Sequence, residues 1–140
     1  MVKEFENEFG KTFCKVSYLT GYKSMLVVWY GYTTKLQLET VMVWVTGQMQ
    51  LTPFEVFIND CSEILSVWGD SIGWVSRIWA YKMTRMGMHK LLHVAKHNSF
   101  GHKIGLELQA ALIDQVVFKT FENRTAALAW LENHLKSAHF

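Results

Sequence analysis

Three chemically useful side chains stand in a row after an apolar, strand-like segment: Asp60, Cys61 and Ser62 follow FEVFIN, residues 54–59. Open α/β sheets tend to place ligand sites at the carboxyl ends of their strands, so these three residues are the first candidates for a binding or catalytic site. A thiol becomes a nucleophile only when a base approaches it, and the sequence pairs Cys61 with none. Asp60 and Ser62 favour closing a turn through hydrogen bonds to the backbone. We predict no catalytic residue here and keep Asp60 and Ser62 as interaction or regulatory candidates.

Histidines recur at every fourth position, at 89, 93 and 97. On a helix this spacing would place three imidazoles on one face and could begin a zinc site. The segment HKLLHVAK, residues 89–96, is strand-like, and on a strand the rings of successive histidines would be about 13 Å apart. That separation is too large for one ion, and a metal site would require His102 to fold back toward one of these histidines. The sequence therefore predicts no metal site.

The stretch GDSIGW, residues 69–74, marks the start of an amphipathic helix. Asp70 or Ser71 would cap that helix, which is worth about 1 kcal/mol, and Gly73 would let the helix approach the sheet. A regulatory alternative stays open, because a phosphate on Ser71 would face the free N–H groups and the positive dipole end of the helix. Asp70 would repel such a phosphate. The cap is the favoured interpretation.

The helix that follows has a core stripe formed by Ile72, Val75, Trp79, Met83 and Met86. A second apolar set, Trp74, Ile78 and Tyr81, lies on an adjoining face, although an amphipathic helix needs only one apolar face. Tryptophan and tyrosine dominate interface energetics. The second set requires a neighbour, which is either the loop that holds Trp68 or another protein. Trp44, off the main stripe of the first helix, raises the same question.

Apolar periodicity and turn signals define the elements that must position these residues. Strands are expected at residues 13–19, 25–32, 54–60, 89–96 and 115–121. Helices are expected at residues 35–50 after a Thr34 cap, 71–86 ending at Gly87, 99–113, and 125–140 after a cap at Asn123 or Thr125. Residues 61–69 are expected to form a loop. This alternation predicts an α/β fold: a mostly parallel sheet of about five strands with an N-terminal hairpin, covered by about four helices.

Length and charge narrow the class of protein. A chain of 140 residues is the size of one domain, so residues 1–140 are taken as a single unit. A net charge of +2 with scattered lysines and arginines does not favour nucleic acid as a partner. Cys14 and Cys61 lack metal-ligand spacing and are expected to be free thiols. The sequence carries no phosphate-binding or dinucleotide motif, so no cofactor is predicted.

The chain has neither an apolar run long enough to span a membrane nor a signal-peptide pattern at its start. We therefore expect a cytoplasmic protein without a transmembrane segment.

Four segments carry a family resemblance: FINDCSEI around Asp60, the helix start DSIGW, the strand in GMHKLLHVAK, and TFENRTAALAWL near the end. In this order they resemble the SpoIIAA-like group of small, largely uncharacterised bacterial proteins, with the STAS fold of anti-sigma-factor antagonists and the related lipid-binding CRAL-TRIO modules. In the antagonists, the second serine of a D-S-S-G-like turn is the phosphorylation target. Here Ile72 stands at that position and has no hydroxyl, so the phosphorylation switch is not carried over.

From the sequence and the resemblance we expect one of three functions. The first is a non-catalytic regulatory or protein-interaction module, which binds another protein or itself as a homodimer through the second helix and the loop before it. The second, implied by the CRAL-TRIO likeness, is a carrier or sensor of a small apolar, lipid-like ligand, with the aromatics and the seven methionines lining a cavity. The third is an enzyme that uses Asp60, Cys61 or the histidines.

Overall fold

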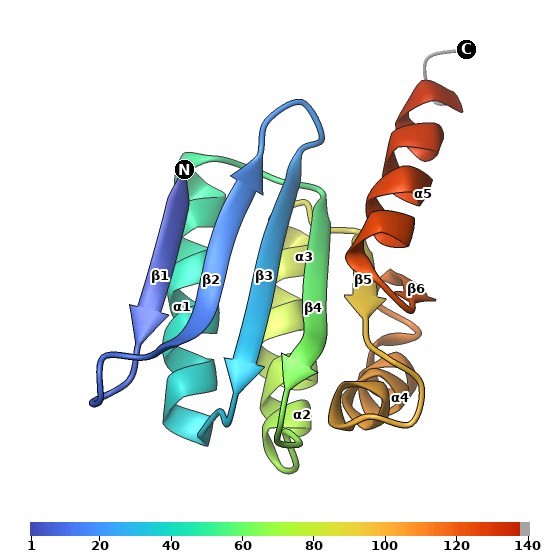
Figure 1. Ribbon diagram of the computed structural model, residues 1–140. Helices are drawn as coiled ribbons and strands as arrows, with labels where there is room; N and C mark the ends of the chain where they lie inside the picture. Colours follow the sequence, from blue (N-terminus) through green and yellow to red (C-terminus); the bar gives the residue numbers. More distant parts are fainter. Residues whose placement is uncertain (138–140) are drawn as a thin grey trace.

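The computed structural model describes residues 1–137 and shows a six-stranded mixed sheet in the spatial order β1-β2-β3-β4-β5-β6 (Figure 1). The strands are β1 (Val2–Glu6), β2 (Thr12–Leu19), β3 (Ser24–Gly31), β4 (Val56–Ile64), β5 (Lys90–Val94) and β6 (Val117–Phe121). The β1–β2 and β2–β3 pairs are antiparallel, and the β3–β4, β4–β5 and β5–β6 pairs are parallel. The α/β class predicted from the sequence is confirmed.

The strands differ from the prediction most clearly in two places, beside small shifts at the ends of the others. The first strand, β1, was not predicted, because VKEFE is short, mostly exposed and without alternating apolar residues. Phe5 of this strand packs edge-on against Trp44, with ring centroids 5.6 Å apart, so β1 supplies the neighbour that Trp44 requires. The prediction of a loop over residues 61–69 is wrong for its first part, because β4 continues to Ile64 and pairs there with Gly31.

The helices occur where the periodicity predicts them. They are α1 (Lys35–Leu51), a continuous helical segment made of α2 (Ser71–Trp74), η1 (Val75–Ala80) and α3 (Tyr81–Arg85), then α4 (Phe100–Leu112) and α5 (Arg124–Ser137). Thr34 caps α1 in a reciprocal capping box: its Oγ1 accepts from the Gln37 N–H, and Gln37 Oε1 accepts from the Thr34 N–H. Gly87, at φ +117°, ends the helical segment after Arg85 as predicted.

The middle of the second helical segment is a π-helix, which the sequence analysis did not anticipate. Its wider turn still leaves the predicted core stripe inside, because Val75, Trp79 and Met83 are buried. Trp79 also donates its indole N–H to the Met42 carbonyl of α1 at 3.1 Å, which ties the two helices together.

Two hydrophobic clusters lie on opposite faces of the sheet. The larger one joins the sheet to α1, the α2–α3 segment and α4, and the smaller one joins it to α5. Alternate residues of β3 enter both clusters: Val27 and Trp29 face the larger one, and Leu26 and Val28 face the smaller. This explains why β3 is apolar throughout, as expected for a strand covered on both faces.

Glycines let α4 approach the sheet closely. A Cβ on Gly101 would clash with the Cys61 carbonyl of β4, and one on Gly105 would clash with the His93 ring of β5. The expectation that Gly73 serves this purpose is wrong, because a Cβ there would meet the side chain of Arg77 on the same helix. Residues 101 and 105 are thus the glycines on which close helix–sheet packing depends.

Among residues 1–137, no helix is both long and apolar enough to cross a membrane.

Candidate functional site

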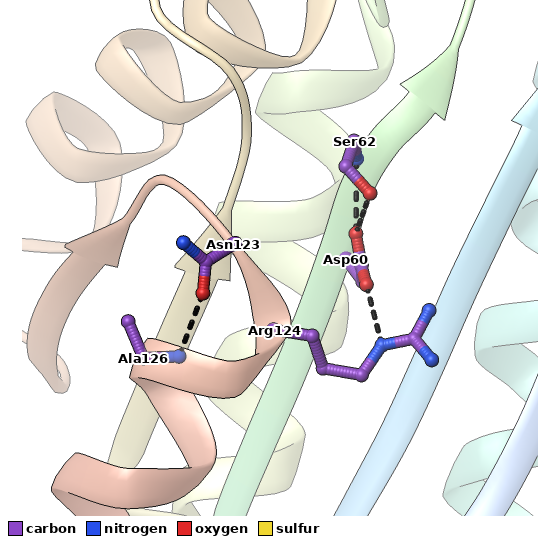
Figure 2. Close-up of polar contacts among 5 residues, drawn as sticks. All are labelled: Asp60, Ser62, Asn123, Arg124 and Ala126. Atoms are coloured by element: carbon purple, nitrogen blue, oxygen red, sulfur yellow. Dashed lines mark hydrogen bonds and ion pairs between the residues drawn. The ribbon is translucent and has the colours of Figure 1, made fainter.

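Asp60 lies on the face of β4 that carries α5, with its side chain 1 % exposed. Three donors surround its carboxylate (Figure 2). Two belong to Ser62: Oδ1 accepts from the Ser62 N–H at 3.0 Å and from the Ser62 hydroxyl at 2.6 Å. Oδ2 accepts from Arg124 Nε–H at 2.8 Å. Asp60 and Ser62 therefore interact directly, as a turn-closing pair does, but within a strand that continues to Ile64.

The start of α5 holds Arg124 in place. Asn123 Oδ1 accepts from the Ala126 N–H at 2.8 Å, the side-chain cap that the sequence predicted at Asn123 or Thr125 (Figure 2). Arg124 follows directly, and its side chain stays 43 % exposed. The ion pair between Arg124 and Asp60 links residues 64 apart in the chain and fastens α5 to the sheet. Sequence reasoning missed Arg124, because an arginine in the first turn of a helix gives no local sign of its partner.

Asn59 occupies the other face of β4 and forms a buried polar network. Its Oδ1 accepts from Trp29 Nε1–H at 2.8 Å, and its Nδ2 lies 3.3 Å from His93 Nδ1 and 3.5 Å from Cys61 Sγ. His93 Nε2 donates to the Gly101 carbonyl at 2.7 Å, so Nδ1 is the acceptor and the ring is the neutral Nε2–H tautomer. Burial lowers the pKa of His93 from 6.5 to about 4. The sequence drew attention to His93 only through the histidine spacing, as a rejected metal ligand and as one of the histidines of a possible enzyme, and it did not draw attention to Asn59.

Cys61 is buried beside this network. Desolvation raises the pKa of the Cys61 thiol well above its ordinary value, and the nearby charge of Asp60 adds to the effect. A buried thiol held in its protonated form is a poor nucleophile. The arrangement gives Cys61 the properties of a packed apolar side chain.

The three histidines that the sequence spacing grouped are separated in the structure. Only His93 lies within β5; His89 precedes the strand and is 3.8 Å from Glu55. His97 follows the strand and packs against His102, with ring centroids 4.8 Å apart, so His102 does fold back, although toward His97 alone. Within the part of the chain that the structure describes, no three His, Cys, Asp or Glu residues form a group that could hold a metal ion.

The side-chain cap predicted in GDSIGW is wrong. Asp70 has helical backbone angles and makes no side-chain cap hydrogen bond, and the Ser71 N–H donates instead to the Trp68 carbonyl at 3.0 Å. Gly69, at φ +50°, turns the chain into the helix through the backbone. Ser71 is only 4 % exposed, so it is poorly accessible to a modifying enzyme.

A surface pocket of about 210 Å³ lies beside this turn, and we name it the Trp68 pocket. Trp68, Asp70 and Ser71 line one side, and Thr33 and Lys35 at the start of α1 line the other. Trp68 itself is buried and packs edge-on against Trp29 in the larger cluster. The loop residue is therefore part of the core and not an exposed contact.

The second apolar set of the α2–α3 segment is divided. Ile78 and Tyr81 are 58 % and 51 % exposed, whereas Trp74 is half-buried against the larger cluster. The guanidinium of Arg85 lies over the Tyr81 ring, 4.3 Å from its centroid. We call the patch formed by Trp74, Ile78, Tyr81 and Arg85 the α2–α3 surface.

The structure thus sorts the predicted site residues into three groups. Asp60 and Ser62 lie on the α5 side of the sheet, Trp68, Asp70 and Ser71 line the Trp68 pocket, and Trp74, Ile78 and Tyr81 form the α2–α3 surface. No family model, curated protein or solved structure matches this chain.

Proposed function

We propose that this protein is a non-catalytic interaction module that binds another protein chain through the α2–α3 surface. The observation that carries the proposal is the exposure of Ile78 and Tyr81, one helical turn apart on a segment that already buries Val75, Trp79 and Met83. Covering these two side chains with a partner would remove apolar surface from water, which favours association. The partner is either a different protein or a second copy of this chain.

The chemistry around the pair supports this role. Tyr81 and Arg85 form a cation–π contact, and tyrosine and arginine are among the residues that most often dominate binding energy at interfaces. The half-buried Trp74 offers a rigid edge beside them, because its other side packs on the core. An anchored aromatic side chain loses little conformational entropy when a partner binds.

The polar groups that catalysis would need are already committed elsewhere. All three donors around Asp60 come from the protein itself, and the thiol of Cys61 is held protonated by burial. These contacts favour the interaction module over an enzyme that uses Asp60, Cys61 or the histidines.

We further infer that the module is SpoIIAA-like. Support comes from the order of strands and helices and from the position of DSIGW at the start of the helix after β4. In such a module, Ile72 in place of the acceptor serine removes the hydroxyl that phosphorylation at that position requires.

The alternative function, a carrier of a small apolar ligand, has weaker support. Five of the seven methionines pack in the core: Met25, Met42, Met49, Met83 and Met88. Methionines in such positions fill space between the helices and the sheet.

Substitution of the exposed pair tests the proposal. The double variant Ile78→Ser, Tyr81→Ser should lose its complexes in size-exclusion chromatography with light scattering. It should also lose the crosslinks that a photoreactive amino acid placed at position 77 forms in the native host. Its unfolding free energy should change by less than about 1 kcal/mol, because both side chains are largely exposed. The matched control is Leu106→Ser, Ile113→Ser, which removes two comparably exposed apolar side chains from the α4 helix and its end. Complexes that persist in the first variant, or that vanish equally in the control, would overturn the proposal.

Native mass spectrometry of protein purified from its own host separates the interaction module from the carrier. A homodimer or hetero-complex without a small-molecule adduct agrees with the interaction module. A small ligand that is lost on denaturation, on a monomeric chain, contradicts it.

A further inference from the structure

The Trp68 pocket lies just beyond the carboxyl ends of the adjacent parallel strands β3 and β4. Open α/β sheets commonly bind ligands in this position, outside the carboxyl ends of their strands. The walls come from two helix starts: Thr33 and Lys35 precede or open α1, and Asp70 and Ser71 precede or open α2. At about 210 Å³, the space is well above the ~10–15 Å³ that a single water requires.

Two of the residues that line this pocket carry buried polar atoms without a hydrogen-bond partner. Among residues 1–137, three buried side-chain atoms lack a partner: Thr33 Oγ1, Trp68 Nε1 and Gln115 Oε1. The first two belong to residues that line the Trp68 pocket, and Trp68 is only 6 % exposed. A buried donor without an acceptor costs roughly 1–3 kcal/mol, and native proteins rarely keep one without a reason. The two unpaired groups point to something that completes this site.

The start of α1 adds further donors and positive charge. α1 has 17 residues, and its capping box leaves the N–H groups of Lys35 and Leu36 without helical acceptors, at the positive end of the helix dipole. The Lys35 ammonium is on the same wall. Asp70, on the opposite wall, is the acidic residue of the lining. Donors therefore outnumber the single carboxylate, which suits a ligand made of acceptor oxygens.

We propose that the Trp68 pocket binds a small oxyanion, a phosphate or carboxylate group, through the Trp68 indole N–H, the Thr33 hydroxyl, the free amides at the start of α1 and Lys35. Both unpaired side-chain atoms are covered from solvent, so binding involves a small side-chain shift in the wall, a change that is common at binding sites. Asp70 weakens binding by repulsion. This site is separate from the α2–α3 surface and does not depend on the proposed function.

Inorganic phosphate is the probe, and the indole N–H signals in two-dimensional ¹⁵N NMR are the readout. The Trp68 signal, assigned by its loss in Trp68→Phe, should shift saturably with a Kd of about 1 mM. The Trp29 signal should stay in place, because its N–H already donates to Asn59. The reference titration uses sodium chloride at equal ionic strength. No saturable shift of the Trp68 signal, or an equal shift in chloride, would overturn the proposal.

A parallel titration with acetate identifies the source of the oxyanion. If acetate saturates the same signal, the site accepts carboxylates and phosphates alike; if only phosphate does so, the site is for phosphate groups. Both results agree with the proposal.

Charge variants of opposite sign locate the ligand without disturbing the core, since both side chains are exposed. Lys35→Gln should weaken phosphate binding about fivefold, and Asp70→Asn should strengthen it about threefold. Lys82→Gln, which removes the same charge from α3, should leave the affinity unchanged. Equal affinities in the Lys35 and Asp70 variants, or changes in the same direction, would show that phosphate binds elsewhere and refute the assignment.

Discussion

Two buried tryptophans, Trp29 and Trp68, lie edge to face with their ring centroids 5.4 Å apart, yet their indole N–H groups are in opposite situations. The N–H of Trp29 donates to Asn59 Oδ1 at 2.8 Å, and the bonds continue through His93 to the Gly101 carbonyl. The N–H of Trp68 finds no acceptor in the described residues. The fold provides an acceptor for the indole N–H of Trp29 but none for the indole N–H of the adjacent Trp68.

This difference separates structural polar groups from those available for binding. The network around Asn59 resembles the site around Asp60 in that each donor or acceptor meets a partner supplied by the chain itself. Satisfied buried networks make the native packing unique, and they leave no group for a ligand. The Trp68 pocket is the place where an incoming acceptor would gain a hydrogen bond that the folded chain does not provide.

The largest expected effect is at the centre of the satisfied network. Asn59→Ala leaves the Trp29 N–H and His93 Nδ1 unpaired in the core and should lower the unfolding free energy by about 4 kcal/mol. Urea denaturation followed by circular dichroism measures the change. Thr33→Val is the contrasting variant: it removes an unpaired hydroxyl with little change of shape and should cost less than about 0.5 kcal/mol. A Thr33 variant as unstable as the Asn59 variant would contradict the distinction between the two regions.

Acid should weaken the satisfied network through His93. The pKa of His93 is about 4 in the folded protein, because burial disfavours the charged ring, and its ordinary value in an unfolded chain is 6.5. Since the folded pKa is the lower one, the unfolded chain binds more protons between these values. The contribution of His93 to stability is therefore complete above pH 6.5, decreases as the pH falls to 4 and then stays constant, for a total of about 3 kcal/mol.

Denaturation midpoints measured across this range test the expectation, with His93→Gln as the control. The difference in stability between the wild-type protein and the variant should shrink as the pH falls from 6.5 to 4. A difference that is constant over this interval would show that His93 titrates normally.

Removal of Arg124 should have a smaller effect. Arg124→Gln takes one of three donors from the buried Asp60 carboxylate and loosens α5. Because the arginine is 43 % exposed, water partly replaces it, and the expected loss is about 2 kcal/mol instead of the larger cost of opening a fully buried pair. Arg77→Gln, at an exposed position on η1, should change the stability by less than about 0.5 kcal/mol. Equal stabilities of the two variants would mean that the Asp60 contact does not hold α5.

Local signals predicted much of this fold. The Thr34 cap, the buried stripe of the α2–α3 segment, the Asn123 cap and the apolar β3 all depend on residues close in the sequence, and each is found in the structure. The turn before α2 was mistaken, because a glycine in the left-handed region can start a helix without the side-chain cap that Asp70 suggested. The strand β1 was missed because it is short and mostly charged and has no alternating apolar residues.

The polar contacts that define the sites could not be predicted from local sequence. Asp60 meets Arg124 across 64 positions, and Asn59 meets His93 across 34 and Trp29 across 30. Pairing of this kind depends on the register of the sheet: β4 aligns Asn59 with His93, and Asp60 with Val28 on one side and Val94 on the other. The sequence indicates which residue types are present, and the register decides which of them meet.

One pair of variants tests the contrast between the two tryptophans most directly: Trp29→Phe and Trp68→Phe, compared by urea denaturation without added phosphate. Both substitutions replace a buried indole with the smaller phenyl ring, but only Trp29→Phe leaves an acceptor, Asn59 Oδ1, without its donor. We predict that Trp29→Phe costs at least about 1 kcal/mol more than Trp68→Phe. An equal or larger loss in Trp68→Phe would show that the Trp68 N–H has a partner inside the protein, and it would contradict both the contrast and the oxyanion site.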